Sequence, residues 1–136
     1  MNQPAIETHT VVVEREIASP AEKIWRALTL PHLIEEWLMK SDFKPVVGCE
    51  FNFRTDWGAI DCRVLEIEPN RTLSYSWDAR GLSSTVTWTL TPTSAGTHLR
   101  MEQTGFRPDQ KQAFHGARRG WQAFLAKLEQ ALARIA

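Results

Sequence analysis

The chain has 136 residues, 43% of them hydrophobic and 24% charged, which is the size and composition of one globular domain with one core. Its 16 Lys and Arg residues balance its 16 Asp and Glu residues, so the net charge gives no support for binding to nucleic acid or anionic lipid. Six Trp and six Phe against one Tyr indicate either a large aromatic core or an apolar cavity.

The amino-terminal sequence and the cysteines predict a cytoplasmic protein. Met1–Glu7 has no basic region and no apolar run, unlike a signal peptide, and no segment reaches the ~20 apolar residues of a membrane span. Cys49 and Cys62 lack the spacing of a metal site and are too few for a disulfide framework. We therefore expect free thiols and no membrane span.

A flexible tail over residues 1–9 is predicted to lead into a strand. At a period of two, the inward-facing residues of this strand are Val11, Val13, Arg15 and Ile17. Arg15 is the polar member of this set. Its guanidinium either reaches past the edge of the sheet to solvent or presents a cation to an interior pocket, and the sequence leaves both open.

Two short helices are predicted next. Ser19 suits the N-cap of the first helix, Pro20 its first turn and Glu22 the reciprocal position of a capping box. Pro31 then ends this helix and begins the second, because proline fits the first turn of a helix but not its interior. The apolar sides of the two helices are formed by Ile24, Trp25, Leu28, Leu33, Ile34, Trp37 and Leu38.

From Phe43 to Gln103 the apolar period changes to two, which predicts an antiparallel meander with one apolar face. The turn sequences that divide its strands lie at 56–58, 69–71, 79–81 and 94–96. Between Ala59 and Glu68 both phases carry apolar residues. The facing of this strand therefore stays open, and a β-bulge is one explanation.

The segment Asp109–Ala136 predicts one long amphipathic helix, with Pro108 and Asp109 at its start. Its apolar stripe consists of Phe114, Ala117, Trp121, Phe124, Leu125, Leu128, Leu132 and Ile135. The sheet has one uncovered apolar face, which this helix is expected to cover. The predicted fold class is therefore α+β over one domain, 1–136: a strongly curved antiparallel sheet wraps around a long carboxy-terminal helix, and two short helices follow the first strand.

Three positions bear on whether the core contains a cavity. Gly116 and Gly120 lie about one turn apart in the long helix, where each costs up to ~1 kcal/mol relative to Ala. Either a neighbouring backbone approaches closely there, or the helix bends and shapes a cavity. Trp57 lies at a predicted hairpin tip, where it borders a cavity mouth, joins a homodimer contact or folds back onto the sheet.

The sequence contains no catalytic motif. It has no G-x-S-x-G, H-E-x-x-H or C-x-x-C, and no glycine-rich phosphate loop. The His residues fall on different predicted elements, so we expect no metal, no cofactor and no catalytic residues. Tyr75, Gln103, His115 and Arg118 are polar residues in or beside apolar faces, where buried polar groups need one another, trapped water or a ligand.

The order of elements and several segments resemble the START-like or Bet v 1-like (SRPBCC) superfamily, in particular the small bacterial domains related to the C-terminal domain of the activator of Hsp90 ATPase (AHSA1 family). The matching segments are IASPAEKIWRAL (17–28), LIEEW (33–37), VLEIEPNRTLSYSW (64–77) and Gly120-Trp121 followed by Leu125, Leu128 and Leu132. This resemblance implies a helix-grip fold with a hydrophobic cavity between sheet and helix, which the superfamily uses for lipids, polyketides, hormones and other apolar molecules.

The first of three functional hypotheses is the non-catalytic binding of a small apolar or amphipathic molecule in that cavity. Its candidate wall residues are Trp25, Trp37, Phe51, Phe53, Tyr75, Trp77, Trp88, Met101, Phe114 and Trp121. Its candidate orienting groups are Arg15, Gln103, His115 and Arg118.

The second hypothesis is an enzyme resembling the polyketide cyclases or hydrolases of the superfamily, with His115 or Tyr75 as the acid or base. The third is a chaperone-interaction module. Eukaryotic Hsp90 activators carry an additional amino-terminal domain, so the single predicted domain counts against the third hypothesis. The aromatic content and the one-sided sheet favour the first.

Overall fold

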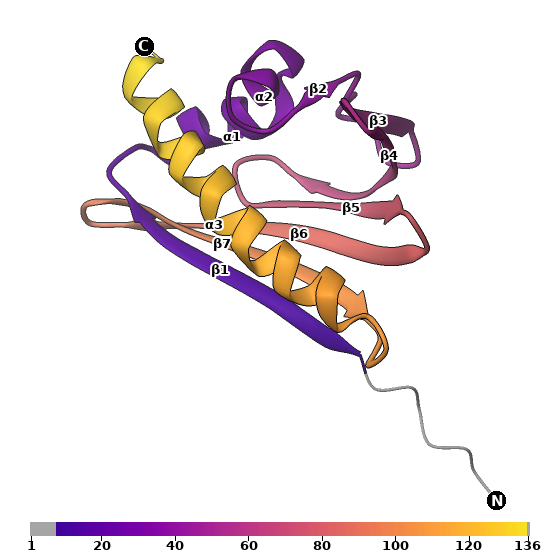
Figure 1. Ribbon diagram of the computed structural model, residues 1–136. Helices are drawn as coiled ribbons and strands as arrows, with labels where there is room; N and C mark the ends of the chain where they lie inside the picture. Colours follow the sequence, from indigo (N-terminus) through magenta and orange to yellow (C-terminus); the bar gives the residue numbers. More distant parts are fainter. Residues whose placement is uncertain (1–7, 136) are drawn as a thin grey trace, which may run out of the picture.

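Within residues 8–135, which the structure describes, a seven-stranded antiparallel sheet curves around one long helix (Figure 1). This computed structural model confirms the predicted α+β helix-grip fold. In chain order the elements are β1 (His9–Ile17), α1 (Ala21–Thr29), α2 (Pro31–Trp37), β2 (Lys40–Ser41), β3 (Glu50–Thr55), β4 (Gly58–Glu68), β5 (Thr72–Ala79), β6 (Leu82–Thr93), β7 (Gly96–Phe106) and α3 (Lys111–Arg134).

The strands lie in the order β1-β7-β6-β5-β4-β3-β2. Strands β3 to β7 pair with their chain neighbours as hairpins, and the predicted turns lie at the hairpin ends. Strand β1 instead lies beside β7, with Val13 opposite Met101. The first and last long strands therefore pair, and the hairpins between them continue the sheet away from β1.

Strand β4 contains the bulge that the mixed apolar phases suggested. Ile60 and Val64 are buried on the inner face, and the pairing register with β5 shifts between Val64 and Glu66. Leu65 lies at this shift and is 45% exposed. Beyond it the phase changes, so that Ile67 packs against the core.

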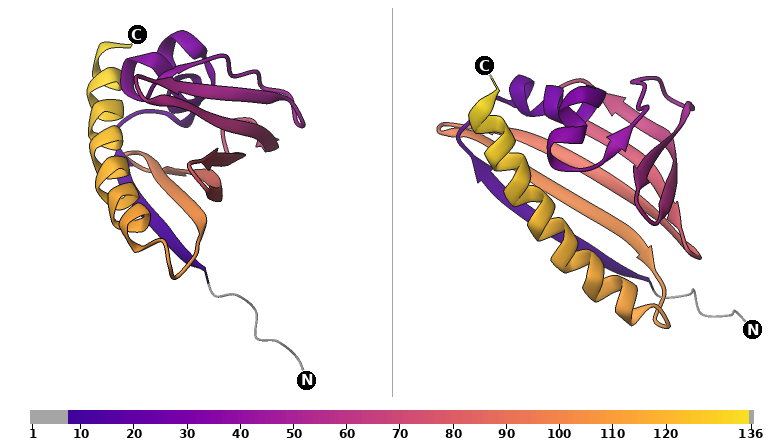
Figure 2. Two further views of the ribbon diagram at one scale, coloured as in Figure 1. Left: turned by 45° about the vertical axis from the view of Figure 1, so that its right-hand side comes forward. Right: turned by 45° about the horizontal axis from the view of Figure 1, so that its top comes forward.

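Helix α3 lies across the inner face of the sheet against β1 and β7, and the short helices α1 and α2 cover the end next to its carboxy terminus (Figure 2). Leu125, Leu128, Ala131 and Leu132 of α3 are buried in this region. Each large apolar side chain buried in this way contributes about 1.5–3 kcal/mol. None of the described helices combines the length and apolarity needed to cross a membrane.

The start of α1 differs from the prediction. Its N-cap position is Pro20 and no side chain caps the helix, so the predicted capping box of Ser19 and Glu22 is wrong. The carbonyl of Ser19 accepts a hydrogen bond from Thr97 Oγ1 at 2.7 Å, and Glu22 pairs with Arg26 at 3.1 Å. A tertiary contact with β7 therefore determines how the chain enters α1.

The start of α3 also differs from the prediction, because the helix begins at Lys111 and not at Asp109. The Asp109 carboxylate accepts a hydrogen bond from Arg107 Nε at 3.2 Å, and the Arg107 backbone N–H donates to Gln110 Oε1 at 2.9 Å. These local bonds form a turn before the helix. Residues 1–7 of the predicted tail lie outside the described residues, and His9 already belongs to β1.

Candidate ligand-binding groove

A groove of about 420 Å³ opens between the amino-terminal half of α3 and the ends of the β3–β4 and β5–β6 hairpins. Typical ligand pockets have volumes of about 300–1,000 Å³. Helix α3 contributes Gly116, Ala117, Gly120, Trp121 and Phe124 to its lining. The opposite side is lined by Leu38, Met39, Thr55, Trp57, Ile60, Trp77, Ala79, Leu82 and Gln103.

The two helix glycines face open space in this groove. A Cβ atom added to Gly116 or Gly120 meets no atom within 4 Å outside its own stretch of helix. The explanation by close approach of a neighbouring backbone is therefore wrong. At these two positions the α3 wall of the groove instead carries no side chain.

Trp57 borders the mouth of the groove, with 52% of its surface exposed. The guanidinium carbon of Arg80, in the β5–β6 turn, lies 4.4 Å from the centroid of the Trp57 ring, a cation–π contact. The indole therefore lies half exposed beside the groove, and the cavity-mouth role stays a prediction. The homodimer contact through Trp57 stays a prediction.

Buried hydrogen bonds connect α3 to the sheet at the floor of the groove. Trp121 Nε1 donates to Gln103 Oε1 at 2.7 Å, and Gln103 Nε2 donates to Ser84 Oγ at 3.0 Å. Ser84 Oγ donates in turn to the carbonyl of Trp77 at 2.7 Å. An indole N–H can only donate, so the Gln103 amide must turn its oxygen toward Trp121.

Other predicted wall residues fill the core and do not line the groove. These are Trp37, Phe51, Phe53, Tyr75, Trp88 and Met101, all of which are buried. The aromatic rings of this set pack edge to face or tilted, with centroids 5.7 Å apart for Trp37 and Trp88 and 5.3 Å apart for Phe51 and Tyr75. Trp88 Nε1 donates to the Tyr75 hydroxyl at 2.9 Å, so these two polar groups satisfy each other.

The remaining predicted site residues lie away from the groove, and they are Arg15, Trp25, Phe114, His115 and Arg118. Arg15 donates a hydrogen bond to Gln122 Oε1 at the outer side of α3. Trp25 and Phe114 are half-buried against the core. His115 and Arg118 are exposed and border a surface hollow on α3.

The groove residues at the ends of the hairpins and just after α2 were not among the predicted site residues. They are Leu38, Met39, Thr55, Ile60, Ala79 and Leu82. Leu38 belonged to a predicted apolar side, and Ala117 and Phe124 belonged to the predicted helix stripe. No sequence signal places the two hairpin ends opposite α3, because that depends on how strongly the sheet curves.

The shifted pKa values in the described part of the chain belong to groups outside the groove. Burial raises the pKa of the Tyr75 hydroxyl and of the Cys62 thiol, so both stay protonated at neutral pH. On the outer face of the sheet, hydrogen bonds with Glu16 and Glu14 raise the pKa of His98. The bond with His98 in turn lowers the pKa of Glu14.

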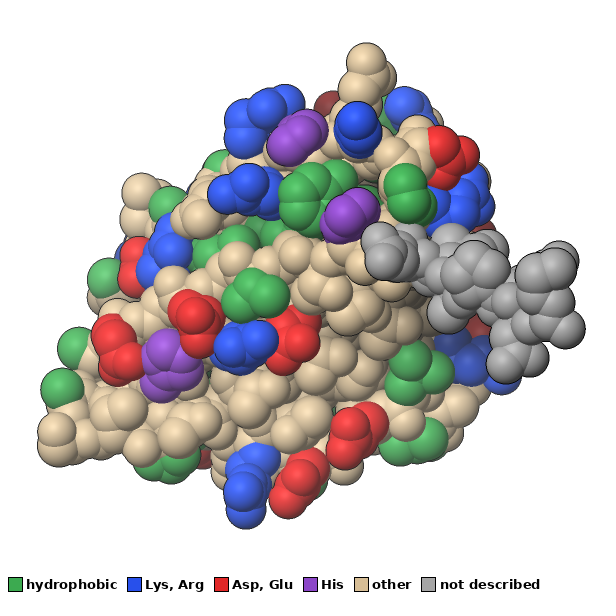
Figure 3. Space-filling view, turned by 90° about the horizontal axis from the view of Figure 1, so that it is seen from below, with side chains coloured by type: hydrophobic (Ala, Val, Ile, Leu, Met, Phe, Trp, Pro, Cys, Tyr) green, Lys and Arg blue, Asp and Glu red, His purple; other side chains and the backbone are tan. Residues whose placement is uncertain are grey.

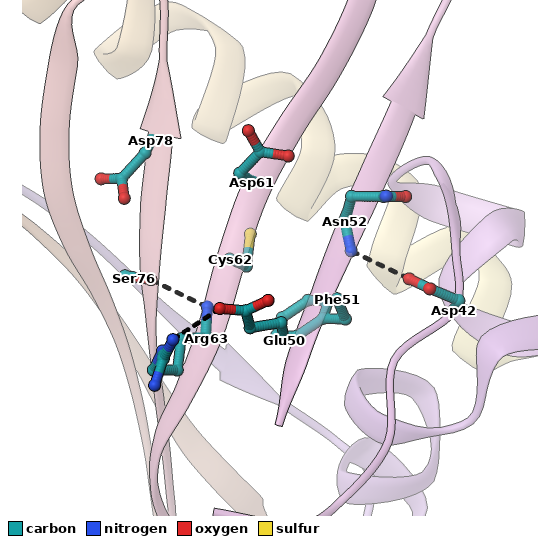
Figure 4. Close-up of a pocket in the computed structure, with 9 residues that line it drawn as sticks. All are labelled: Asp42, Glu50, Phe51, Asn52, Asp61, Cys62, Arg63, Ser76 and Asp78. Carbon is teal, nitrogen blue, oxygen red and sulfur yellow. Dashed lines mark hydrogen bonds and ion pairs between the residues drawn. The ribbon is translucent and has the colours of Figure 1, made fainter. Parts of the chain in front are cut away.

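A second hollow, of about 460 Å³, lies on the outer face of β3, β4 and β5 (Figure 4). Its charged side chains are Asp42, Glu50, Asp61, Arg63 and Asp78. Glu50 pairs with Arg63 at 2.5 Å, and Asp42 Oδ1 accepts the backbone N–H of Asn52 at 2.9 Å. Within residues 8–135 no group of three His, Cys, Asp or Glu side chains is arranged to hold a metal ion. An apolar molecule would meet charged walls there, so the groove beside α3 is the better candidate.

Comparison with known families gives one match over most of the chain. Residues 18–133 match the family described as Activator of Hsp90 ATPase homolog 1-like protein. No curated protein matches the sequence.

Solved structures share the fold over nearly the whole chain. Protein MLL2253 from Mesorhizobium loti is 61% identical, with a TM-score of 0.91, over 94% of this chain and 99% of that one. The Aha1 dimer from Colwellia psychrerythraea is 22% identical, with a TM-score of 0.82, over 91% of this chain and 96% of that one.

DynU16, a protein in the dynemicin biosynthetic locus, is 23% identical with a TM-score of 0.83. The match covers 91% of this chain and 47% of DynU16, so this chain spans about half the length of DynU16. At these identities, DynU16 and the Colwellia protein show the fold alone.

Proposed function

We propose that this chain, which belongs to the family of activator of Hsp90 ATPase homolog 1-like proteins, binds a small hydrophobic or amphipathic molecule in the groove beside α3, without converting it. The fold hosts many functions, so the family match alone does not support a ligand. Support comes from the groove, whose walls include Trp57, Trp77 and Trp121. Large aromatic walls with few polar groups are typical of sites for apolar ligands.

The observation that carries this proposal is the pair of helix glycines. Each glycine in a helix interior costs up to ~1 kcal/mol relative to Ala. Neither Gly116 nor Gly120 is required by packing, since a Cβ atom at either position meets no neighbour within 4 Å. Their shared property is that they keep the α3 side of the groove open.

Gln103 is the polar group positioned to orient a ligand. Its amide nitrogen carries two hydrogens, and Ser84 accepts one of them. Among the described residues the second hydrogen has no acceptor, and Gln103 is part of the groove lining. A carbonyl, ether or hydroxyl oxygen of the ligand would satisfy it.

The groove offers no group for acid–base chemistry. Among the described residues, its lining contains no Asp, Glu, His, Cys, Lys, Arg or Tyr side chain. Of the two candidates for an acid or base, His115 lies on the solvent side of α3. The other, Tyr75, is buried in the core with its pKa raised by burial. This arrangement supports binding over catalysis.

The proposal is tested by filling the groove from α3. Nile red, a neutral apolar dye, is titrated against the protein and its fluorescence measured. We expect wild type to bind it and Gly120→Leu to bind about tenfold or more weakly, because the new side chain would occupy the groove. Thermal unfolding of the variant should stay at or above the wild-type midpoint.

Ala123→Leu is the matched control, since Ala123 is an exposed residue of the same helix and its enlargement leaves the groove unchanged. This variant should bind Nile red as wild type does. If a broad panel of apolar compounds gave no binding to wild type, or if Gly120→Leu bound the dye unchanged, the proposal would be overturned.

A second candidate function is a protein-interaction module, and one observation favours it. His115, Arg118 and Arg119 are exposed side by side on α3, away from the groove. The space-filling view in Figure 3 shows basic and His side chains in the upper part of one face, whereas acidic side chains lie in the lower part of that face. If this surface acts on Hsp90, adding the protein should change Hsp90 ATPase turnover, and Arg118→Glu with Arg119→Glu should abolish the change. No change on adding wild type would remove this candidate.

A further inference from the structure

We propose that the ligand is an amphipathic anion, whose apolar body lies in the groove and whose acidic group binds Arg80 and Lys111 just beyond it. This inference rests on the proposed function, because it names the chemical class of the molecule bound at the same site. The inference is based on the groove beside α3 and on another hollow that meets it at the end of the β5–β6 hairpin.

The adjoining hollow is distinct from the one on the outer face of the sheet. It has a volume of about 660 Å³ and lies between the β5–β6 turn and the start of α3. Ala79 and Leu82, which flank the turn, line both the groove and this hollow. Gln110 Nε2 donates to the carbonyl of Gly81 at 3.3 Å, so the turn is also bonded to the start of α3. A molecule longer than the groove would extend into this space.

The two compartments differ in charge. The groove is lined by apolar and uncharged side chains, whereas the adjoining hollow contains Arg80, Lys111 and Asp109. The carboxylate of Asp109 is already bonded to Arg107. Within residues 8–135, neither Arg80 nor Lys111 forms an ion pair with a carboxylate. The free charge in this hollow is therefore positive, and it borders an apolar groove.

The position of Arg80 is determined by its turn. Its φ of 50° and the φ of 80° at Gly81 place both residues in the left-handed region, which non-glycine residues rarely adopt. The turn holds the guanidinium over the ring of Trp57, which borders the groove. The N–H bonds of a guanidinium lie in its own plane. When the group stacks on an aromatic ring, these donors point outward and can bind a carboxylate or sulfate with two hydrogen bonds.

Other ligand charges fit this arrangement less well. A cationic ligand would meet Arg80 and Lys111 at the groove mouth, with no unpaired carboxylate in the lining of either hollow. A neutral ligand would make no use of the two cations. A molecule with an apolar chain or ring system and a terminal carboxylate matches both compartments. Its apolar part would lie in the groove, and its carboxylate would bind the two cations in the adjoining hollow.

The test compares three probes with the same alkyl chain: dodecanoate, 1-dodecanol and dodecyltrimethylammonium. Displacement of Nile red from wild type is measured for each probe at low ionic strength, below the micelle concentrations of the two ionic probes and the solubility limit of 1-dodecanol. We expect dodecanoate to bind about tenfold or more tightly than 1-dodecanol, and the ammonium compound most weakly. Added salt should narrow the difference between dodecanoate and 1-dodecanol, since the acidic group binds in partly exposed surroundings.

The variant Arg80→Gln with Lys111→Gln should lower the affinity for dodecanoate to that for 1-dodecanol and leave 1-dodecanol binding unchanged. Arg119→Gln, on the solvent side of α3, is the control and should behave as wild type. Equal binding of dodecanoate and 1-dodecanol to wild type, or an unchanged preference in the double variant, would overturn the inference while leaving the proposed function intact. Failure of all three probes and of Nile red would instead overturn the proposed function, and this inference with it.

Discussion

The two halves of α3 belong to one apolar stripe but face different surroundings. In the carboxy-terminal half, Leu125, Leu128 and Leu132 are buried where the helix packs against β1, α1 and α2. In the amino-terminal half, Gly116 and Gly120 face a groove and have no close neighbour. The difference shows that one helix can stabilise the fold at one end and leave space at the other, because two glycines lie beside the stripe in the amino-terminal half.

Trp121 lies at the boundary between these halves. Its ring packs 5.1 Å from that of Trp77 and 5.6 Å from that of Trp88, while its other side lines the groove. Its Nε1 bond to Gln103 attaches α3 to β7 at the same point. The packed core and the open groove therefore share one wall.

Truncating a side chain in the packed half should have the largest effect. Leu128 is fully buried, so Leu128→Ala is expected to lower the free energy of unfolding by about 2–5 kcal/mol, measured by urea denaturation. Nile red affinity of the folded variant should stay unchanged, because Leu128 does not line the groove. Lys127→Ala, at the exposed neighbouring position, is the control. If both variants lost the same small amount, the carboxy-terminal half would not be the stabilising half.

A change at the boundary should have an intermediate effect. Gln103→Leu leaves the buried Trp121 Nε1 without its acceptor, which is expected to lower the free energy of unfolding by about 1–3 kcal/mol. The indole N–H resonance of Trp121 should shift strongly in NMR spectra. Gln130→Leu, on the exposed side of α3, should change stability by no more than ~0.5 kcal/mol. An unchanged Trp121 resonance would contradict the hydrogen bond.

The smallest effect is expected in the open half, and it has the opposite sign. Gly120→Ala should raise the free energy of unfolding by up to ~1 kcal/mol, because the added Cβ meets no atom within 4 Å. Gly96→Ala is the contrasting variant. Its Cβ would lie 2.1 Å from the carbonyl oxygen of Ile17, and its φ is +154°, so this variant should be strongly destabilised. If thermal unfolding showed Gly120→Ala destabilised as well, the space beside α3 would not be open.

Much of the fold was predictable because it depends on local periodicity and turn chemistry. The turns, the one-sided strands and the two short helices separated at Pro31 all follow from residues close in sequence. The starts of α1 and α3 were not predictable in the same way. Ser19 has the chemistry of an N-cap, but its carbonyl bonds Thr97, a residue far along the chain.

The candidate site was predictable only in part. Of the predicted wall and orienting residues, Trp77, Gln103 and Trp121 line the groove. Trp57 and the glycines Gly116 and Gly120 were singled out for other reasons and line it as well. Trp88 and Tyr75 have the same inward phase as Trp77, yet they fill the core and bond each other.

The sequence by itself determined the order of the long elements, the apolar faces of the long strands other than β4 and the stripe of α3, because these depend on the direction in which consecutive side chains point. The tertiary structure decided which of the inward aromatic rings are packed and which border open space. That outcome depends on the distance between sheet and helix, which varies along α3 with the curvature of the sheet and with the short helices at one end. Periodicity specifies the face on which a side chain lies, whereas the separation of the layers specifies what it meets there.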